Sequence, residues 1–186
     1  MYKIIAIVGE AGCGKDSLLD LACAQIPNLN KIISTTTRPQ REGEKEGVNY
    51  YYTDYDTFTK DLLEDKFIEA TTFNGWGYGT KIDTLSEDKV NIGVFNPSGI
   101  YIMQGDKRID LFVIKLSVNA KERLLRQLNR EFAPNVDEII RRYQTDQQDF
   151  EIFDEEVECE YVILPNNTRE QLQKNVQYIQ DMVDEN

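Results

Sequence analysis

Short runs of apolar residues alternate along this 186-residue chain with segments in which apolar residues recur at helical spacing. The first run, from Tyr2 to Val8, is typical of a buried strand. Between Leu18 and Ile26 the apolar residues follow one face of a predicted helix, and Pro27 predicts its end. The N-terminal segment is therefore predicted as a strand, a turn and a helix.

The same alternation continues in the second half of the chain. We predict buried strands over residues 90–96, 111–116 and 161–164. A helix over residues 120–130, with Leu124, Leu125 and Leu128 facing inward, is followed by a break at residues 131–135. Two further helical faces are formed by Ile139, Ile140, Tyr143, Phe150 and Phe153, and by Leu172, Val176, Ile179 and Val183. Strands alternating with helices predict the α/β class, with a parallel sheet flanked by helices.

A glycine-rich segment fills the turn between the first strand and the first helix. It has the pattern G-x-x-x-x-G-K and ends in Lys15. Glycine lets backbone N–H groups approach phosphate oxygens, and both the following helix N-terminus and Lys15 add positive charge. The alternative is a glycine-rich turn that binds nothing. We expect a phosphate-binding loop (P-loop) that binds a polyphosphate through Gly9, Glu10, Ala11, Gly12, Cys13, Gly14, Lys15, Asp16 and Ser17.

The residue after the P-loop lysine is unusual. A standard P-loop has Ser or Thr there, whose hydroxyl holds Mg2+. This chain has Asp16, and Ser17 follows it. A carboxylate can ligate Mg2+ directly or through water. Asp16 is therefore a candidate metal ligand, or alternatively a residue that only complements the positive helix N-terminus.

A second polar segment, from Ser34 to Tyr50, carries the sequence S-T-T-T-R-P-Q-R-E-G-E. Arg38 and Arg41 lie within it, and a guanidinium group suits phosphate because it donates two hydrogen bonds in a planar fork. A polyphosphate site followed closely by a monophosphate site suggests an enzyme that moves a phosphoryl group between two nucleotides.

These segments together resemble guanylate kinases, of the nucleoside monophosphate kinase family. That family shows S-x-T-T-R-x-x-R-x-G-E-x-x-G-x-x-Y, then F-x-E, then Y-G-[ST] behind a P-loop. The matching residues here are Ser34 to Tyr50, Phe67 to Glu69, and Tyr78 to Thr80. The resemblance runs without visible gaps from Lys3 to about Thr80 and more loosely to the C-terminus.

The resemblance implies roles in binding GMP. Arg38, Arg41, Tyr50 and Tyr78 would hold its phosphate, and Ser34, Glu69 and Thr80 would contact its guanine. Glu69 is the most specific of these, because a carboxylate accepts hydrogen bonds from guanine N1–H and N2–H, which adenine does not offer in that arrangement. A buried polar site strongly rejects a base that leaves it unpaired.

One strand departs from the family pattern. Guanylate kinases carry D-x-D on the strand after the base-contacting segment, whereas this chain has Val94 and Asn96 when aligned on Gly99. Asn96 still offers a carbonyl oxygen to guanine but adds no negative charge. Asp16 would then replace the missing carboxylate from another direction; the alternative is a weakened or relaxed enzyme.

The C-terminal half would supply the ATP side. In guanylate kinases this region is a lid whose arginines close on the phosphates. Arg126 and Arg130 fit the family's R-x-x-x-R, with Arg126 on the ATP side. Arg142 fits the later lid arginine if one residue is inserted, and Arg141 takes that role otherwise; solvated surface arginines are the alternative. Asn166 fits the family's adenine-contacting Asn, although an Asn in a turn is equally consistent.

Composition bounds this picture. The net charge of −12 argues against a nucleic-acid or anionic-membrane surface. Three cysteines without C-x-x-C, in a chain with no histidine, argue against zinc-finger and disulfide frameworks and favour the cytoplasm. The first apolar run is too short for a signal peptide or a membrane span.

The expected organisation is a single guanylate-kinase-like domain over residues 1–186. Its P-loop core would comprise residues 1–33 and 83–186, with a mixed α/β GMP-binding lobe at 34–82 and a helical lid at about 126–142. The expected activity is Mg2+-dependent transfer from ATP to GMP or dGMP by a monomer or homodimer. The alternatives are a deoxynucleoside monophosphate kinase of broader base specificity and a non-catalytic phosphopeptide-binding domain of guanylate-kinase type.

Overall fold

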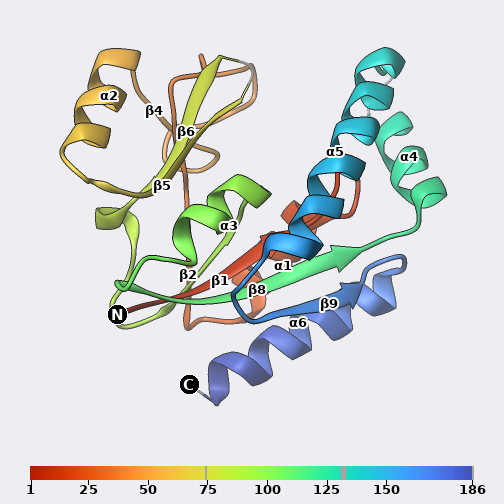
Figure 1. The fold of residues 1–186 in the computed structure, drawn as a ribbon. Helices are drawn as coiled ribbons and strands as arrows, with labels where there is room; N and C mark the ends of the chain where they lie inside the picture. The colour runs from red at the N-terminus through yellow and green to blue at the C-terminus, as the bar shows by residue number, and fades with distance from the viewer. Residues whose placement is uncertain (74, 131–132, 186) are drawn as a thin grey trace.

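A five-stranded parallel sheet forms the centre of the computed structural model, which describes residues 1–73, 75–130 and 133–185. Its strand order is β2-β7-β1-β8-β9 (Figure 1). The strands are β1 (Tyr2–Val8), β2 (Leu29–Lys31), β7 (Val90–Val94), β8 (Ile109–Ser117) and β9 (Tyr161–Pro165). Every pairing in this sheet is parallel, as the alternation of strands and helices predicts.

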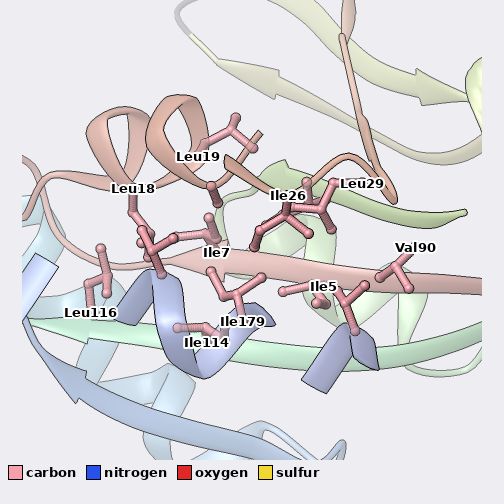
Figure 2. Close-up of a cluster of buried hydrophobic side chains, with 14 of the residues drawn as sticks. Ile5, Ile7, Leu18, Leu19, Ile26, Leu29, Val90, Ile114, Leu116 and Ile179 are labelled. Atoms are coloured by element: carbon pink, nitrogen blue, oxygen red, sulfur yellow. The ribbon is translucent and has the colours of Figure 1, made fainter. Parts of the chain in front are cut away.

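Helices cover both faces of this sheet. One apolar cluster joins the sheet to α1 (Lys15–Gln25) and α6 (Arg169–Asp184), and it includes Ile5, Ile7 and Ile179 (Figure 2). The other cluster joins the opposite face to α3 (Pro97–Met103) and α5 (Val136–Glu156) through residues such as Ile4 and Phe153. Because both faces are buried, β1 is a continuous apolar run rather than an alternating one.

A second sheet lies beside the first and has the order β4-β3-β6-β5. Its strands are β3 (Thr35–Thr36), β4 (Tyr51–Tyr52), β5 (Phe67–Phe73) and β6 (Trp76–Lys81), and the α-helix between β4 and β5 is α2 (Tyr55–Leu63). The β5–β6 and β3–β6 pairs are antiparallel, whereas β3–β4 is parallel. The 3-10 turn η1 (Ile82–Thr84) leads back toward the first sheet. This is the mixed α/β lobe that the sequence predicts.

The predicted burial was wrong on two helices. On α4 (Ala120–Leu128), Leu125 is 42% exposed and the buried residue is Arg123, only 4% exposed. On α5, Ile140 is 49% exposed, while Phe150 and Phe153 are buried as expected. The reason on α4 is that Arg123 faces the polar P-loop, where Glu10 offers an ion pair. Part of the predicted break at 131–135 lies outside the described residues.

A buried asparagine connects the two sheets. Asn91 of β7 is fully buried, and its amide nitrogen donates to the backbone oxygens of Lys3 (3.1 Å) and Ser86 (2.9 Å). Its carbonyl oxygen accepts from the Ser86 backbone N–H (2.8 Å) and from Asn30 (2.7 Å). Asn30 in turn donates to the Thr84 backbone oxygen. The segment that leaves the second sheet is therefore held against the first by satisfied buried hydrogen bonds.

We predict that Asn91→Ala lowers the free energy of unfolding by roughly 2–4 kcal/mol, because it leaves several buried backbone groups without partners. Denaturant unfolding measures this difference. Asn28→Ala, at an exposed turn position, is the control and should change the free energy of unfolding by less than about 0.5 kcal/mol. Equal effects of the two substitutions would show that the Asn91 hydrogen bonds contribute nothing.

Candidate functional site

A cavity of about 770 Å³ lies between the two sheets, at the carboxyl end of β1 and β7. Open parallel sheets bind ligands at this end of their strands, because the loops that follow converge there. Many of the residues expected to bind nucleotides line the cavity. These are Lys15, Asp16, Ser34, Arg38, Arg41, Tyr50, Glu69, Tyr78, Asn96, Arg130 and Arg142.

The P-loop follows β1 directly and has a conformation that requires glycine. Gly12 has φ +81°, and a Cβ atom there would lie 2.6 Å from the backbone oxygen of Arg123. Gly14 has φ +90° and forms the N-cap of α1 without a side-chain hydrogen bond. A side chain at Gly12 would therefore push the loop away from α4.

Every backbone oxygen from Gly9 to Cys13 accepts a hydrogen bond from a side-chain nitrogen. Lys15 Nζ donates to the oxygens of Gly9 (2.5 Å) and Glu10 (3.3 Å). The other donors are Gln127 to Ala11, Arg126 to Gly12 and Asn166 to Cys13, at 3.4, 3.4 and 2.8 Å. The carbonyl groups of the P-loop are thus occupied. Gln127 is not among the residues that the sequence motifs place at the site.

Contacts with α4 and the segment after β9 explain where Arg126 and Asn166 lie. Arg126 also donates to the backbone oxygens of Asn166 and Asn167 and pairs with Glu122. Asn166 is 4% exposed, and its Oδ1 is buried without a partner. Both side chains support the P-loop from behind, and neither lines the cavity. Their expected contacts with ATP stay predictions.

Three P-loop residues differ in how their side chains are placed. Cys13 is buried, and burial raises the pKa of its thiol. Glu10 pairs with Arg123 at 2.8 Å. Ser17 is exposed in the first turn of α1. Their expected contribution to ATP binding through the loop backbone remains a prediction.

Asp16 is exposed, lies in the first turn of α1 and lines the cavity beside Lys15. In the described parts of the chain no group of three or more His, Cys, Asp or Glu side chains could hold a metal by itself. A single carboxylate nevertheless fits Mg2+, which usually keeps several waters and binds through one or two carboxylates plus substrate phosphates.

On the lobe side, Glu44 organises the two expected phosphate-binding arginines. Its carboxylate pairs with Arg38 at 2.7 Å and accepts from the Arg41 backbone N–H and the Tyr52 hydroxyl at 2.8 Å each. The hydrogen bond from Arg38, followed by that from the Arg41 backbone, lowers the pKa of Glu44 to about 2. Glu44 belongs to the motif that matches the family, but no binding role was predicted for it.

Aromatic contacts complete this end of the cavity. The Arg38 guanidinium lies 5.3 Å from the centre of the Tyr50 ring, and the Tyr50 and Tyr78 rings meet edge to face at 5.9 Å. Burial raises the pKa of Tyr50, so its hydroxyl remains a hydrogen-bond donor. Two arginines and two tyrosines therefore converge on one wall, a donor set suited to a phosphate monoester.

Glu69 lies at the buried end of the cavity and is 6% exposed. Burial raises the pKa of its carboxyl to about 7, although the neighbouring Thr80 hydroxyl and backbone N–H act in the opposite direction. Thr80 is fully buried, and its Oγ1 has no partner in hydrogen-bonding geometry. A carboxyl and an unpaired hydroxyl side by side fit a ligand that offers several N–H and carbonyl groups.

Asn96 lines the cavity, but its amide is already engaged. Its Oδ1 accepts from the Gly99 backbone N–H at 2.8 Å and caps α3, while Nδ2 donates to Thr71 Oγ1 at 3.3 Å. The carbonyl that sequence analysis assigned to guanine thus stabilises a helix N-terminus here. Its role toward a base stays a prediction.

The structure separates the two alternatives for the later lid arginine. Arg130 and Arg142 line the cavity, whereas Arg141 does not. Arg141 and Arg142 both pair with Glu138, at 2.7 and 2.8 Å. Hydrogen bonds from these arginines lower the pKa of Glu138 to about 2. Arg142, the candidate that requires an insertion in the preceding loop, is the one placed at the site.

None of the helices in residues 1–73, 75–130 and 133–185 has the length and apolar character of a membrane-spanning segment.

Comparison with known proteins identifies the family. The family model described as guanylate kinase matches residues 1–185. A guanylate kinase of Legionella pneumophila is 32% identical over 79% of this chain and 71% of its own length, and one of Synechococcus sp. (strain JA-3-3Ab) is 28% identical over 92% and 79%.

Some sequence matches are shorter. The matches to guanylate kinases of Chlorobium chlorochromatii, 43% identical, and Helicobacter hepaticus, 37% identical, cover 44% and 47% of this chain but only 43% and 46% of those proteins. Among solved structures, a guanylate kinase from Anaplasma phagocytophilum superposes with a TM-score of 0.63 at 18% identity, over 98% of this chain and 85% of that one, and so supports the fold. On the strength of the match over residues 1–185, this chain belongs to the guanylate kinase family.

Proposed function

We propose that this protein transfers the γ-phosphoryl group of ATP to GMP or dGMP, giving ADP and GDP or dGDP. The observation that carries this proposal is that one cavity combines Lys15 of the P-loop, the Arg38–Arg41–Tyr50–Tyr78 wall and the buried Glu69. A P-loop lysine and an arginine–tyrosine wall that line one cavity suit a phosphoryl donor and its acceptor.

The proposed mechanism is positioning and charge neutralisation by this chain's own residues. Lys15 would leave its hydrogen bonds to the Gly9 and Glu10 oxygens and bind the phosphates of ATP. Arg130 and Arg142 would neutralise charge on the group being transferred. The acceptor would be the phosphate oxygen of GMP itself, without a covalent enzyme intermediate. The sequence contains no histidine, which excludes histidine-based acid–base or nucleophilic steps.

Asp16 is the proposed Mg2+-binding residue, because it is the exposed carboxylate of α1 adjacent to Lys15 at the cavity. When bound with ATP, Mg2+ would neutralise charge on the phosphates. The carboxylate would keep the ion on the P-loop side of the cavity, where the strand ending near Val94 and Asn96 offers no acid.

Recognition of guanine would depend on the charge of Glu69. Guanine N1–H and N2–H are both donors, so the carboxyl must be deprotonated to accept from both. Thr80 and Ser34 would contact the same base. Glu44 would hold Arg38 and Arg41 in place for the GMP phosphate through the contacts described above.

The proposed organisation follows from these roles. Residues 1–33 and 83–186 would form the ATP-binding core, 34–82 the GMP-binding lobe, and about 126–142 the lid. A cytoplasmic location and a monomeric or homodimeric state are part of the same proposal. The cysteines are free thiols, as a reducing compartment requires.

The direct test is a coupled assay of ADP release with GMP, dGMP, AMP, dTMP and CMP as acceptors. Turnover with GMP and dGMP alone supports the proposal. Comparable turnover with dTMP or CMP would instead support the broader deoxynucleoside monophosphate kinase suggested by Val94 and Asn96. No turnover with any acceptor would favour a binding domain, although the intact P-loop glycines and Lys15 argue against it.

Lys15→Met should lower kcat by orders of magnitude while leaving the fold intact, because the ammonium group is needed for the transferring phosphoryl group rather than for the core. Turnover and thermal unfolding are measured on the same sample. Near-normal turnover in this variant would contradict the mechanism.

GMP binding should weaken in acid because Glu69 must lose its proton. With a pKa of about 7 in the free protein, KM for GMP should rise about tenfold between pH 8 and pH 6. The GMP phosphate also titrates in this range. In Glu69→Gln only the titration of the GMP phosphate remains, so KM for GMP should depend less steeply on pH. This variant should also have a much higher KM for GMP and nearly unchanged ATP binding.

The Glu69 carboxyl should also make the stability of the protein depend on pH when no ligand is added. Because its pKa is higher in the folded than in the unfolded protein, its contribution to stability is greatest below about pH 4.5 and is lost as the pH rises through 7. Thermal unfolding of wild type and Glu69→Gln across this range measures the difference. Parallel curves would show that Glu69 is ionised in the free protein.

Asp16→Ala should raise the Mg2+ concentration needed for half-maximal rate, and excess Mg2+ should partly restore the rate. Asp16→Ser returns the usual hydroxyl without a carboxylate, so its recovery should be incomplete. If Asp16 only complements the helix N-terminus, stability falls by roughly 0.5–2 kcal/mol and the Mg2+ dependence stays unchanged. Mg2+ titrations and thermal unfolding distinguish these two results.

A further inference from the structure

A carboxylate from α5 accepts a hydrogen bond from the P-loop backbone. The backbone N–H of Ala11 donates to Asp146 Oδ2 at 2.5 Å, a contact between residues 135 positions apart in the chain. Asp146 lies in the middle of α5, which passes close to the P-loop (Figure 1). Asp146 belongs to none of the predicted site motifs and has no part in the proposed transfer reaction.

The bound atom resembles the P-loop's expected ligand. P-loop N–H groups bind phosphate oxygens, and a carboxylate oxygen has the same sign of charge and the same ability to accept. The backbone oxygens of residues 9–13 are all occupied by side-chain donors, and the Cys13 N–H donates to the Glu10 backbone oxygen at 3.2 Å. The Ala11 N–H, in contrast, points to an anionic acceptor. Asp146 therefore occupies a position suited to a phosphate oxygen.

Neighbouring contacts hold α5 in this place. Tyr143, one turn before Asp146, lies with its ring 5.0 Å from the guanidinium of Arg123. Arg123 pairs with Glu10 at 2.8 Å, and its Nε and Nη1 are buried without partners. The helix thus contacts Ala11 directly and Glu10 through Arg123.

The arrangement also brings like charges together. Burial raises the pKa of Glu10, Arg123 lowers it, and the nearby Asp146 raises it further. Phosphates arriving at the same loop would add more negative charge beside Asp146. Arg142 lies one turn from Asp146, on the same side of α5, and lines the cavity. One helix therefore presents to the site a cation that a phosphate attracts and an anion that it repels.

We propose that Asp146 is an intramolecular competitor for ATP: its carboxylate occupies a phosphate-oxygen position at the Ala11 N–H, and a bound triphosphate replaces it. Triphosphate binding is then linked to movement of the Asp146 segment of α5 away from the P-loop. This rests on the proposed function only in taking the P-loop as a phosphate site. The competition multiplies the association constant for ATP by the fraction of molecules in which Asp146 does not occupy the Ala11 N–H.

The test compares Asp146→Asn with Glu151→Gln. Both substitutions remove one negative charge from α5. Glu151 lies five residues after Asp146 on the same helix, is exposed and does not line the cavity, so it serves as the control. Calorimetry with ATP, and separately with inorganic tripolyphosphate, should show about tenfold tighter binding to Asp146→Asn than to wild type. Glu151→Gln should bind both ligands as wild type does.

A second measurement examines the contact without any ligand. The amide resonance of Ala11 should shift toward the position of a weaker hydrogen bond in Asp146→Asn and stay in place in Glu151→Gln. Asp146→Ser removes the charge and also shortens the side chain, so it should shift the Ala11 resonance in the same direction and tighten binding as well. This variant replaces Asp146→Asn in the test if the latter does not fold.

Unchanged or weaker binding of both ligands in the folded Asp146 variants would overturn the proposal, whatever happens to the Ala11 resonance. Equal tightening by Glu151→Gln would also overturn it, because the effect would then be general charge and not occupancy of the P-loop. If the wild type transfers no phosphoryl group but tripolyphosphate binding tightens as expected, the competition stands and the proposed kinase activity fails.

Discussion

The geometry of the site depends on how the P-loop's polar groups are divided. Its backbone oxygens from Gly9 to Cys13 are each satisfied by a side-chain nitrogen, from Lys15 within the loop and from Gln127, Arg126 and Asn166 behind it. A loop whose carbonyl groups are bonded in this way can turn N–H groups such as that of Ala11 toward an anion. The positive N-terminus of α1 attracts the same anion. The site therefore relies on α4 and the segment after β9 as much as on the P-loop sequence.

The electrostatics of the cavity differ from those of the whole chain. The net charge is −12, yet cations outnumber carboxylates in the cavity lining. The cations are Lys15, Lys31, Arg38, Arg41, Arg130 and Arg142, and the carboxylates are Asp16, Asp20, Glu44 and Glu69. Part of the acidic charge is used to position these cations, since Glu44 holds Arg38 and Glu138 holds Arg142. These partners hold guanidinium groups whose side-chain entropy would otherwise be lost on binding an anion. A strongly acidic protein can in this way keep a site for anions.

Two carboxyl groups near the cavity have pKa values shifted in opposite directions, one by hydrogen bonds and the other by burial. Glu44 accepts from Arg38 and a backbone N–H, and its pKa is low, about 2. Glu69 lies deeper, and burial raises its pKa to about 7. The first is a permanently charged support for arginines. The second can change its protonation state when a ligand supplies donors, which is the property expected of a group that selects a base.

The sequence by itself determined the fold class and predicted most of the residues that line the candidate cavity, because the glycine and lysine spacing in the P-loop and the arginine–tyrosine motif are local patterns. The order of strands and helices followed from apolar periodicity in the same way. Only the tertiary structure decided that Arg123 rather than Leu125 is buried, that Arg142 rather than Arg141 faces the cavity, and that Asp146 contacts Ala11. Each of these depends on which side of a helix meets the P-loop, and a charged residue is buried where a partner distant in the chain compensates its charge.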